Sequence, residues 1–317
     1  MTTDLIAAVD TAKRAVRAAS RLCMQVADRG TARLEKGGRE PVTLADYGSQ
    51  AVILGLISAE FPGHAVLAEE GAAHLLDHSD GGIRSDLAAL VATVTGGACT
   101  IDDLLARIDH AGGEGLLVWA VDPIDGTKGF LRGDQFAVAV GLLEGARPVA
   151  GVLGCPRLSI GETSGVLVWG GPGVGAFVEP IAGGDARSIR VSEVADPAGV
   201  RVLGSVETSH GDPAIIERAV AAAGLGGGWM RIDSQAKYAA VAAGLAETYI
   251  RPRNRKDWRE RAWDHAAGAA IVAGAGGRVT DLDGRDLDFS AGATLENNRG
   301  VLATNGLVHD LMLEVLG

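Results

Sequence analysis

The pattern of apolar and polar positions divides the first part of the chain into short elements. From Leu5 to Val26, apolar residues recur at spacings of three and four among charged residues, which predicts an amphipathic helix. A second helix is expected over 45–61, because a Pro-Gly pair ends its pattern. The polar stretch 35–40 predicts a loop between the two helices, and the apolar run 66–68 predicts a short strand.

The middle of the chain changes character at residue 116. Residues 71–115 are rich in Gly, Asp and His, with two short helical pieces near 85–91 and 101–108, and we expect this stretch to cover one edge of a site. An apolar strand at 116–121 and two hairpins within 136–180 follow. Their alternating pattern predicts an antiparallel sheet.

After about residue 200, strand and helix patterns alternate. Helices are expected to start at Asp212, Ser234 and Trp263, and a last helix closes the chain. This alternation is typical of an α/β unit. The change near residue 190 therefore predicts two domains, an α+β domain of 1–190 with an antiparallel sheet and an α/β domain of 191–317.

Composition excludes several classes of function. With 47% hydrophobic residues among 317, the chain can bury a sizeable core. Its net charge of −11 (29 basic against 40 acidic residues) disfavours binding to nucleic acid or to an anionic membrane. Cys23, Cys99 and Cys155 lack the spacing of a zinc site or a redox dithiol, so we expect packed, reduced thiols.

The sequence gives no sign of a targeting or membrane segment. The amphipathic N-terminal pattern does not have the plan of a signal peptide. No apolar run approaches the roughly 20 residues that a membrane helix requires. We therefore expect a soluble protein of the cytoplasm.

Two carboxylates stand directly after the apolar run 116–121. Asp122 and Asp125 are separated by Pro123 and followed by Gly126, so neither carboxylate can swing freely, and Gly126-Thr127 can open a helix with free N–H groups beside them. A set of oxygen ligands without histidine favours Mg²⁺, and substrate phosphates supply part of the coordination of this ion. The stretch therefore predicts a magnesium and phosphate site.

Two other acidic sites also stand at the end of a predicted strand or the start of a predicted helix. Glu69 and Glu70 follow the predicted strand at 66–68, and Asp264 begins the helix pattern of WDHAAG. Taken singly, Asp122 and Asp264 could be helix caps and Glu69-Glu70 a solvated turn. The three positions together favour one metal cluster.

These stretches also carry a family resemblance. VLAEE, DPIDGTKGF and WDHAAGAAIVAGAGG resemble the signatures of the lithium-sensitive, Mg²⁺-dependent phosphatases of the inositol monophosphatase superfamily. PVTLADYGSQ, FLRGDQFAVAVGLLEGARPVAGVLGCP and RIDSQAKYAAVAAG narrow the resemblance to the 3'(2'),5'-bisphosphate nucleotidases. The resemblance implies a layered αβαβα sandwich, of the α/β class, with the site between an antiparallel-sheet part and an α/β part.

The resemblance also implies roles for the acidic residues. Two or three Mg²⁺ ions would be held by Glu69, Asp122, Asp125 and Asp264 and by the backbone carbonyl of Ile124. Such ions activate a water and neutralise the attacking and leaving oxygens. Glu70 would lie in the second shell or bind a metal-bound water.

Asp46 and Thr127 resemble the pair that orients and deprotonates the attacking water. Because a threonine hydroxyl is a poor base, the carboxylate must draw the proton through it. The helix that opens at Gly126-Thr127 would hold the scissile phosphate, with Asp264 beside it.

On the substrate side, the resemblance places His210, Ser234, Lys237 and Arg251 around the second phosphate and the nucleoside of adenosine 3',5'-bisphosphate. Ser234 and Lys237 are three residues apart at an expected helix start and would share a face. Tyr238 and Trp263 are expected to be packing residues.

The function implied is hydrolysis of the 3'-phosphate of adenosine 3',5'-bisphosphate to AMP, with activity on 3'-phosphoadenylyl sulfate and a role in sulfur assimilation. The basic stretch 251–262 is either a solvated loop or a rim that attracts a polyanionic substrate. One alternative is a phosphatase for an inositol phosphate or a sugar bisphosphate. The other is a sensor that binds the bisphosphate without turnover, although the presence of Asp46 and Thr127 speaks against it.

Overall fold

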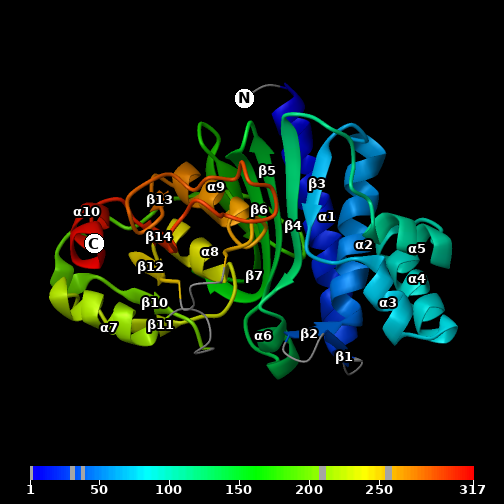
Figure 1. The fold of residues 1–317 in the computed structure, drawn as a ribbon, viewed down its shortest axis with the longest axis horizontal. Helices are drawn as coiled ribbons and strands as arrows, with labels where there is room; N and C mark the ends of the chain where they lie inside the picture. Colours follow the sequence, from blue (N-terminus) through cyan, green and yellow to red (C-terminus); the bar gives the residue numbers. More distant parts are fainter. Residues whose placement is uncertain (1–2, 29–32, 37–39, 207–211, 254–258) are drawn as a thin grey trace.

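The computed structural model describes residues 3–28, 33–36, 40–206, 212–253 and 259–317, and these form alternating layers of helices and sheets (Figure 1). The order across the molecule is helix, sheet, helix, sheet, helix. This is the layered sandwich that the family resemblance implied.

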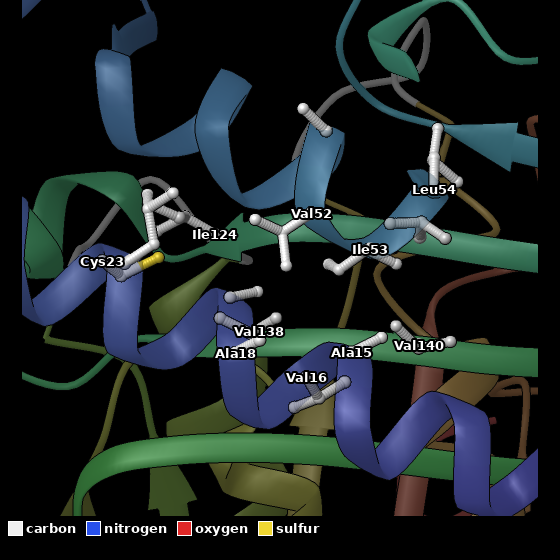
Figure 2. Close-up of a cluster of buried hydrophobic side chains, with 14 of the residues drawn as sticks. Ala15, Val16, Ala18, Cys23, Val52, Ile53, Leu54, Ile124, Val138 and Val140 are labelled. Atoms are coloured by element: carbon white, nitrogen blue, oxygen red, sulfur yellow. The ribbon is translucent and has the colours of Figure 1, made fainter. Parts of the chain in front are cut away.

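The first layer consists of α1 (Thr3–Asp28) and α2 (Leu44–Glu60), which pack against each other and against a seven-stranded sheet. Figure 2 shows their apolar side chains meeting those of the sheet, with Val16 and Val52 on the helices and Val138 and Ile124 on the strands. Burial of these faces explains why the N-terminal pattern has a helical period.

The seven-stranded sheet carries the first carboxylates. Its order is β3-β4-β5-β6-β7-β8-β9, in which β3 and β4 are parallel and the other pairs are antiparallel. The strands are β3 (Ala65–Ala68), β4 (Leu117–Asp125), β5 (Ala137–Glu144), β6 (Arg147–Ile160), β7 (Thr163–Gly171), β8 (Gly175–Pro180) and β9 (Arg187–Ile189).

The second sheet has five strands in the order β11-β10-β12-β14-β13. The strands are β10 (Val202–Gly204), β11 (Trp229–Arg231), β12 (Thr248–Arg251), β13 (Arg278–Thr280) and β14 (Val301–Thr304). Helices α8 (Ala236–Ala242) and α9 (Ala266–Gly274) lie between the sheets, whereas α7 (Pro213–Ala222) and α10 (His309–Leu316) pack on the outer side (Figure 1).

One prediction for the first half was wrong, and another was incomplete. The stretch 35–40 is not simply a loop, because β1 (Arg33–Lys36) and β2 (Glu40–Thr43) pair as a hairpin whose charged sequence has no apolar alternation. The stretch 71–115 holds both predicted helical pieces, in α4 (Gly81–Thr95) and α5 (Ile101–Ile108), and one further helix, α3 (Ala72–His78). Helices α4 and α5 pack against α2 and each other, and α3 packs against α5; this packing stabilises helices whose periodicity is weak.

The change of sheet falls after β9 and before β10, close to the predicted boundary near residue 190. One buried cluster nevertheless joins both parts, since Ala137 and Val168 of the first sheet share it with Ala267 and Leu203. The division into domains 1–190 and 191–317 therefore stays an interpretation. Within the described residues, every helix is too short or too polar to cross a membrane.

Candidate active site

Asp122 and Asp125 lie at the end of β4, where the pairing with β5 is irregular. Asp122 pairs with Ala139 and Asp125 with Ala137, so three steps on β4 oppose two steps on β5. In a regular strand, residues three apart face opposite sides of the sheet. The bulge at Pro123-Ile124 removes that mismatch and lets both carboxylates face the same space.

The carboxylates form one electrostatic cluster. Burial raises the pKa of Asp122 well above its usual value, and the charges of Glu69, Asp125 and Asp264 raise it further. Burial and the charge of Asp264 also raise the pKa of Asp125 to about 6, against the opposing effect of Lys237 and Arg251. The charges of three acidic groups, from three separate segments, therefore act on Asp122.

The cluster fits a hard divalent cation. Asp122 is 2% exposed, and its Oδ1 has no hydrogen-bond partner in the part of the chain that the structure describes. A buried carboxylate oxygen without a partner is costly unless a cation supplies the missing interaction. An all-oxygen set of carboxylates is typical of a Mg²⁺ site.

Helix α2 fixes the turn that holds Glu69 and Glu70. The Gln50 amide donates to the backbone carbonyls of Glu70 (2.7 Å) and Ile108 (2.8 Å), and its Oε1 accepts from the Glu70 N–H (3.0 Å). Ser49, beside it, donates to the Pro123 carbonyl (2.8 Å). One buried helix face thus ties the turn after β3 to the bulge of β4.

Asp46 lies on the same face of α2 and closes its N-terminus. Its Oδ2 accepts from the backbone N–H (2.7 Å) and the hydroxyl (2.6 Å) of Thr43, which forms a capping box. Burial, followed by the charge of Glu70, raises the pKa of Asp46 to about 7. A carboxyl group with that pKa can exchange a proton near neutral pH.

Thr127 begins α6 (Thr127–Arg132) and faces Asp46. Its Oγ1 lies 3.4 Å from Asp46 Oδ1 and 3.1 Å from the Ile124 carbonyl oxygen, either of which can accept its proton. The distance to Asp46 exceeds the usual O–H···O range, as is common in catalytic hydrogen bonds before substrate binds. The expected pair is therefore brought together in space, although its residues are 81 apart in sequence.

The second sheet approaches the first through Ser234 and Gln235. Gly126 has a φ of 85°, and a Cβ on it would lie 3.0 Å from the Ser234 Cβ, so only glycine fits without movement. The Gln235 N–H donates to Asp125 Oδ2 (2.6 Å), while its amide bonds the Trp263 carbonyl (2.9 Å). Gln235 therefore connects the β4 carboxylates to the segment that carries Asp264.

One geometric prediction for the substrate residues was wrong. Ser234 has a φ of 68° and precedes α8, so it does not share a helical face with Lys237; its hydroxyl accepts from the Ala236 N–H (3.2 Å). The predicted helix start was placed too early because the left-handed turn is not visible in the sequence pattern.

Lys237 and Arg251 bring two cations to the acidic cluster. Lys237 is 2% exposed, donates to the Ile232 carbonyl (3.2 Å) and lies over the ring of Tyr249. Burial lowers its pKa to about 8, against the charge of Asp125. Arg251 Nη2 lies 3.1 Å from Asp264 Oδ2 and 2.8 Å from Glu260 Oε2.

The remaining sequence predictions divide into two groups. Tyr238 and Trp263 are buried, in line with packing roles. His210 and part of the basic stretch 251–262 lie outside the described residues. Five polar residues near the site were not predicted from the sequence: Ser49, Gln50, Gln235, Glu260 and His265. Ser49 and Gln50 follow Asp46 at i+3 and i+4 on α2, and this spacing was a signal that could have indicated them.

A surface cavity elsewhere is lined by Arg147, Ala273, Phe289 and neighbouring residues, and it includes none of the predicted site residues. It lies at the far end of β5, beside the β5–β6 turn. The carboxylates predicted to bind metal lie in the acidic cluster and not in this cavity.

Comparison with known proteins identifies the family. The profile of the inositol monophosphatase family matches residues 4–316. The chain is 36% identical to a 3'(2'),5'-bisphosphate nucleotidase of Emericella nidulans, over 89% of each chain. It is 38% identical to one of Oryza sativa, over 93% of this chain and 89% of the relative.

Solved structures share the fold. An IMPase of Thermotoga maritima superposes with a TM-score of 0.69 at 24% identity, covering 97% of this chain and 95% of that one. An inositol monophosphatase of Anabaena superposes with a TM-score of 0.68 at 25% identity, covering 99% and 96%.

Proposed function

The chain belongs to the inositol monophosphatase family, and we propose that it is a Mg²⁺-dependent phosphatase that removes the 3'-phosphate of adenosine 3',5'-bisphosphate to leave AMP. The observation that carries the proposal is the buried carboxylate cluster around Asp122, beside the Asp46–Thr127 pair. The names of the relatives support the choice of substrate.

The proposed metal ligands are the four carboxylates of the cluster and the Ile124 carbonyl. When bound there, two or three Mg²⁺ ions would place positive charge beside the phosphate oxygens and lower the pKa of a bound water. When the Thr127 proton is directed to Asp46, the Ile124 carbonyl oxygen keeps its lone pairs for a cation. Glu70, whose charge acts on Asp46, stays a proposed outer residue of the site.

Proton transfer is assigned to Asp46 and Thr127. The Thr127 hydroxyl oxygen accepts a hydrogen bond from the attacking water, and its own proton points to Asp46. With a pKa of about 7, Asp46 is basic enough to draw that proton near neutral pH. Gly126 and the N–H groups at the start of α6 are proposed to contact the scissile phosphate.

The second phosphate and the nucleoside are assigned to Ser234, Lys237, Arg251 and His210, with Asp264 between substrate and metal. Lys237 and Arg251 are the cations whose charges act on Asp125, so a phosphate beside them would lie next to the proposed metal centre. The proposal also includes activity on 3'-phosphoadenylyl sulfate, a role in sulfur assimilation and a location in the cytoplasm.

The test is phosphate release from adenosine 3',5'-bisphosphate, adenosine 3'-monophosphate and inositol 1-phosphate, each with Mg²⁺ and with EDTA. We expect kcat/KM to be at least about 10-fold higher for the bisphosphate, because each additional charge-assisted hydrogen bond contributes about 1.5–3 kcal/mol. Activity with EDTA should be lost.

Two results would contradict the proposal. Equal or faster turnover of inositol 1-phosphate would assign the site to that substrate class. Tight binding of the bisphosphate without phosphate release from any substrate would indicate a sensor.

A further inference from the structure

Arg251, at the end of β12, lies between the carboxylates of Glu260 and Asp264. Its Nη2 is 2.8 Å from Glu260 Oε2 and 3.1 Å from Asp264 Oδ2. Donor atoms of Glu260, Asp264 and His265 lie within 4.8 Å of one another, a spacing that could suit a cation. The Arg251 guanidinium already supplies positive charge at that point, and Glu260 serves as its partner.

Glu260 is held by a chain of buried groups. It is 3% exposed, and His265 Nε2 lies 3.2 Å from its Oε2, while the Tyr238 hydroxyl lies 2.7 Å from His265 Nδ1. Because a carboxylate can only accept, Nε2 carries the proton and Nδ1 accepts from Tyr238. This chain fixes the orientation of Glu260, and Glu260 in turn fixes Arg251.

Arg251 competes with a metal ion for the carboxylate of Asp264. A guanidinium with one carboxylate partner forms a close, two-bond pair with it, and that geometry takes up the oxygens a metal would need. Asp264 is a proposed metal ligand, whereas the Oε2 of Glu260 already serves Arg251 and His265. A second carboxylate beside Arg251 therefore weakens the interaction between the arginine and Asp264.

We propose that Glu260, oriented by His265 and Tyr238, is a positioning residue that holds Arg251 in place and so leaves Asp264 available to Mg²⁺. The inference rests on the proposed function, because it takes Asp264 as a metal ligand. In this proposal Glu260 acts through Arg251 and is not itself a metal ligand.

The experiment measures Mn²⁺ binding to the full-length protein without substrate, from the electron paramagnetic resonance signal of free Mn²⁺. Removal of a charged group that positions a metal ligand lowers affinity by roughly 10- to 100-fold, so Glu260→Gln should raise the Kd for Mn²⁺ about 10-fold. An unchanged Kd would overturn the inference.

Glu247→Gln is the matched control. Glu247 is a fully buried glutamate paired with Arg201 at 2.6 Å, and it lies just before the other end of β12. The same loss of charge in a similar ion pair should change the Kd for Mn²⁺ by less than about twofold. A loss of affinity equal to that of Glu260→Gln would show a general effect of breaking a buried ion pair and would overturn the inference.

A double-mutant cycle separates positioning from a direct charge effect. If Glu260 acts through Arg251, then Glu260→Gln in an Arg251→Gln background should change the Kd by less than about twofold. A 10-fold effect that persists without the arginine would overturn the inference. The double variant removes both buried charges, so this comparison also serves if the single Glu260→Gln variant does not fold.

The outcomes also distinguish the inference from the proposed function. If the wild type binds Mn²⁺ and releases phosphate while Glu260→Gln binds Mn²⁺ equally well, only the inference fails. If the wild type neither binds Mn²⁺ nor releases phosphate, both fail.

Discussion

At the scale of single residues, the site depends on carboxylates whose environment disfavours their charge. Asp122 is the clearest case, because burial and three acidic neighbours raise its pKa and one of its oxygens has no partner in the described chain. Such a residue weakens the protein unless a cation is bound. The proposed metal site explains why a carboxylate occupies this buried position.

Asp122→Asn should lower kcat for every phosphate ester to less than about 1% of the wild-type value, because it removes a charged metal ligand. Thermal unfolding of the metal-free variant should show equal or higher stability, since a buried negative charge is lost. Asp281→Asn is the control, because Asp281 is a fully buried aspartate that binds the backbone N–H groups of Asp283 and Arg285 in a remote loop. Comparable activity in Asp122→Asn and the wild type at saturating Mg²⁺ would refute the metal assignment.

Thr127→Ala should lower kcat by roughly 10²- to 10⁴-fold with little change in KM, because the hydroxyl is proposed to orient the water and not to hold the nucleotide. Thr127→Ser keeps the hydroxyl and should restore most of the rate. Steady-state kinetics on adenosine 3',5'-bisphosphate separates the two parameters. An effect on KM alone would contradict the role.

At the scale of elements, α2 organises the site from one face. Asp46, Ser49 and Gln50 follow one another on that face and bind the segment before the helix, the β4 bulge and the turn after β3. Most of the remaining helix is apolar and packs in the core, whereas Glu60 at its end pairs with Arg14. Core packing therefore sets the position of the turn that carries Glu69 and Glu70.

Gln50→Ala should reduce both stability and activity, because it leaves backbone groups of Glu70 and Ile108 buried without partners. The expected loss in the free energy of unfolding is on the order of 3 kcal/mol. Urea unfolding gives the stability, and kcat at a temperature where the variant is fully folded gives the activity.

Asn305→Ala is the matched control for Gln50→Ala. Asn305 is also a buried amide that binds backbone carbonyls, those of Ser192 (3.2 Å) and Val194 (2.8 Å), away from the cluster. It should cost similar stability with kcat unchanged. A normal kcat in folded Gln50→Ala would show that α2 supports the fold only.

At the scale of the whole molecule, the raised carboxyl pKa values link stability to pH and metal. Asp46 and Asp125 have pKa values of about 7 and about 6, above those of an unfolded chain. Between about pH 4 and 7 the native state therefore binds more protons than the unfolded state. Each excess proton lowers the free energy of unfolding by about 1.4 kcal/mol per pH unit as the pH rises.

In EDTA, thermal stability should therefore fall from pH 5 to pH 8 more steeply for the wild type than for Asp46→Asn. The difference between the two proteins is the measurement, because His309, with a pKa lowered to about 4 by burial, acts in the opposite direction. Mg²⁺ binds the ionised carboxylates, so its stabilising effect should grow over the same range. Parallel pH profiles for wild type and Asp46→Asn would contradict the assigned pKa of Asp46.

The sequence alone determined the order of most helices and strands, the antiparallel and α/β parts of the chain, and the carboxylates at the ends of strands. Those features depend on local information, namely the period of apolar positions and the Pro and Gly residues that end elements. Asp122 was recognisable because an apolar strand led directly into it.

Only the tertiary structure decided how these residues meet. The bulge that turns Asp122 and Asp125 to one side depends on pairing with β5, and the contact of Gly126 with Ser234 joins segments more than 100 residues apart. Gln50 and Glu260 act through partners that no local pattern specifies. Long-range packing sets these distances, and a periodic sequence signal carries no information about them.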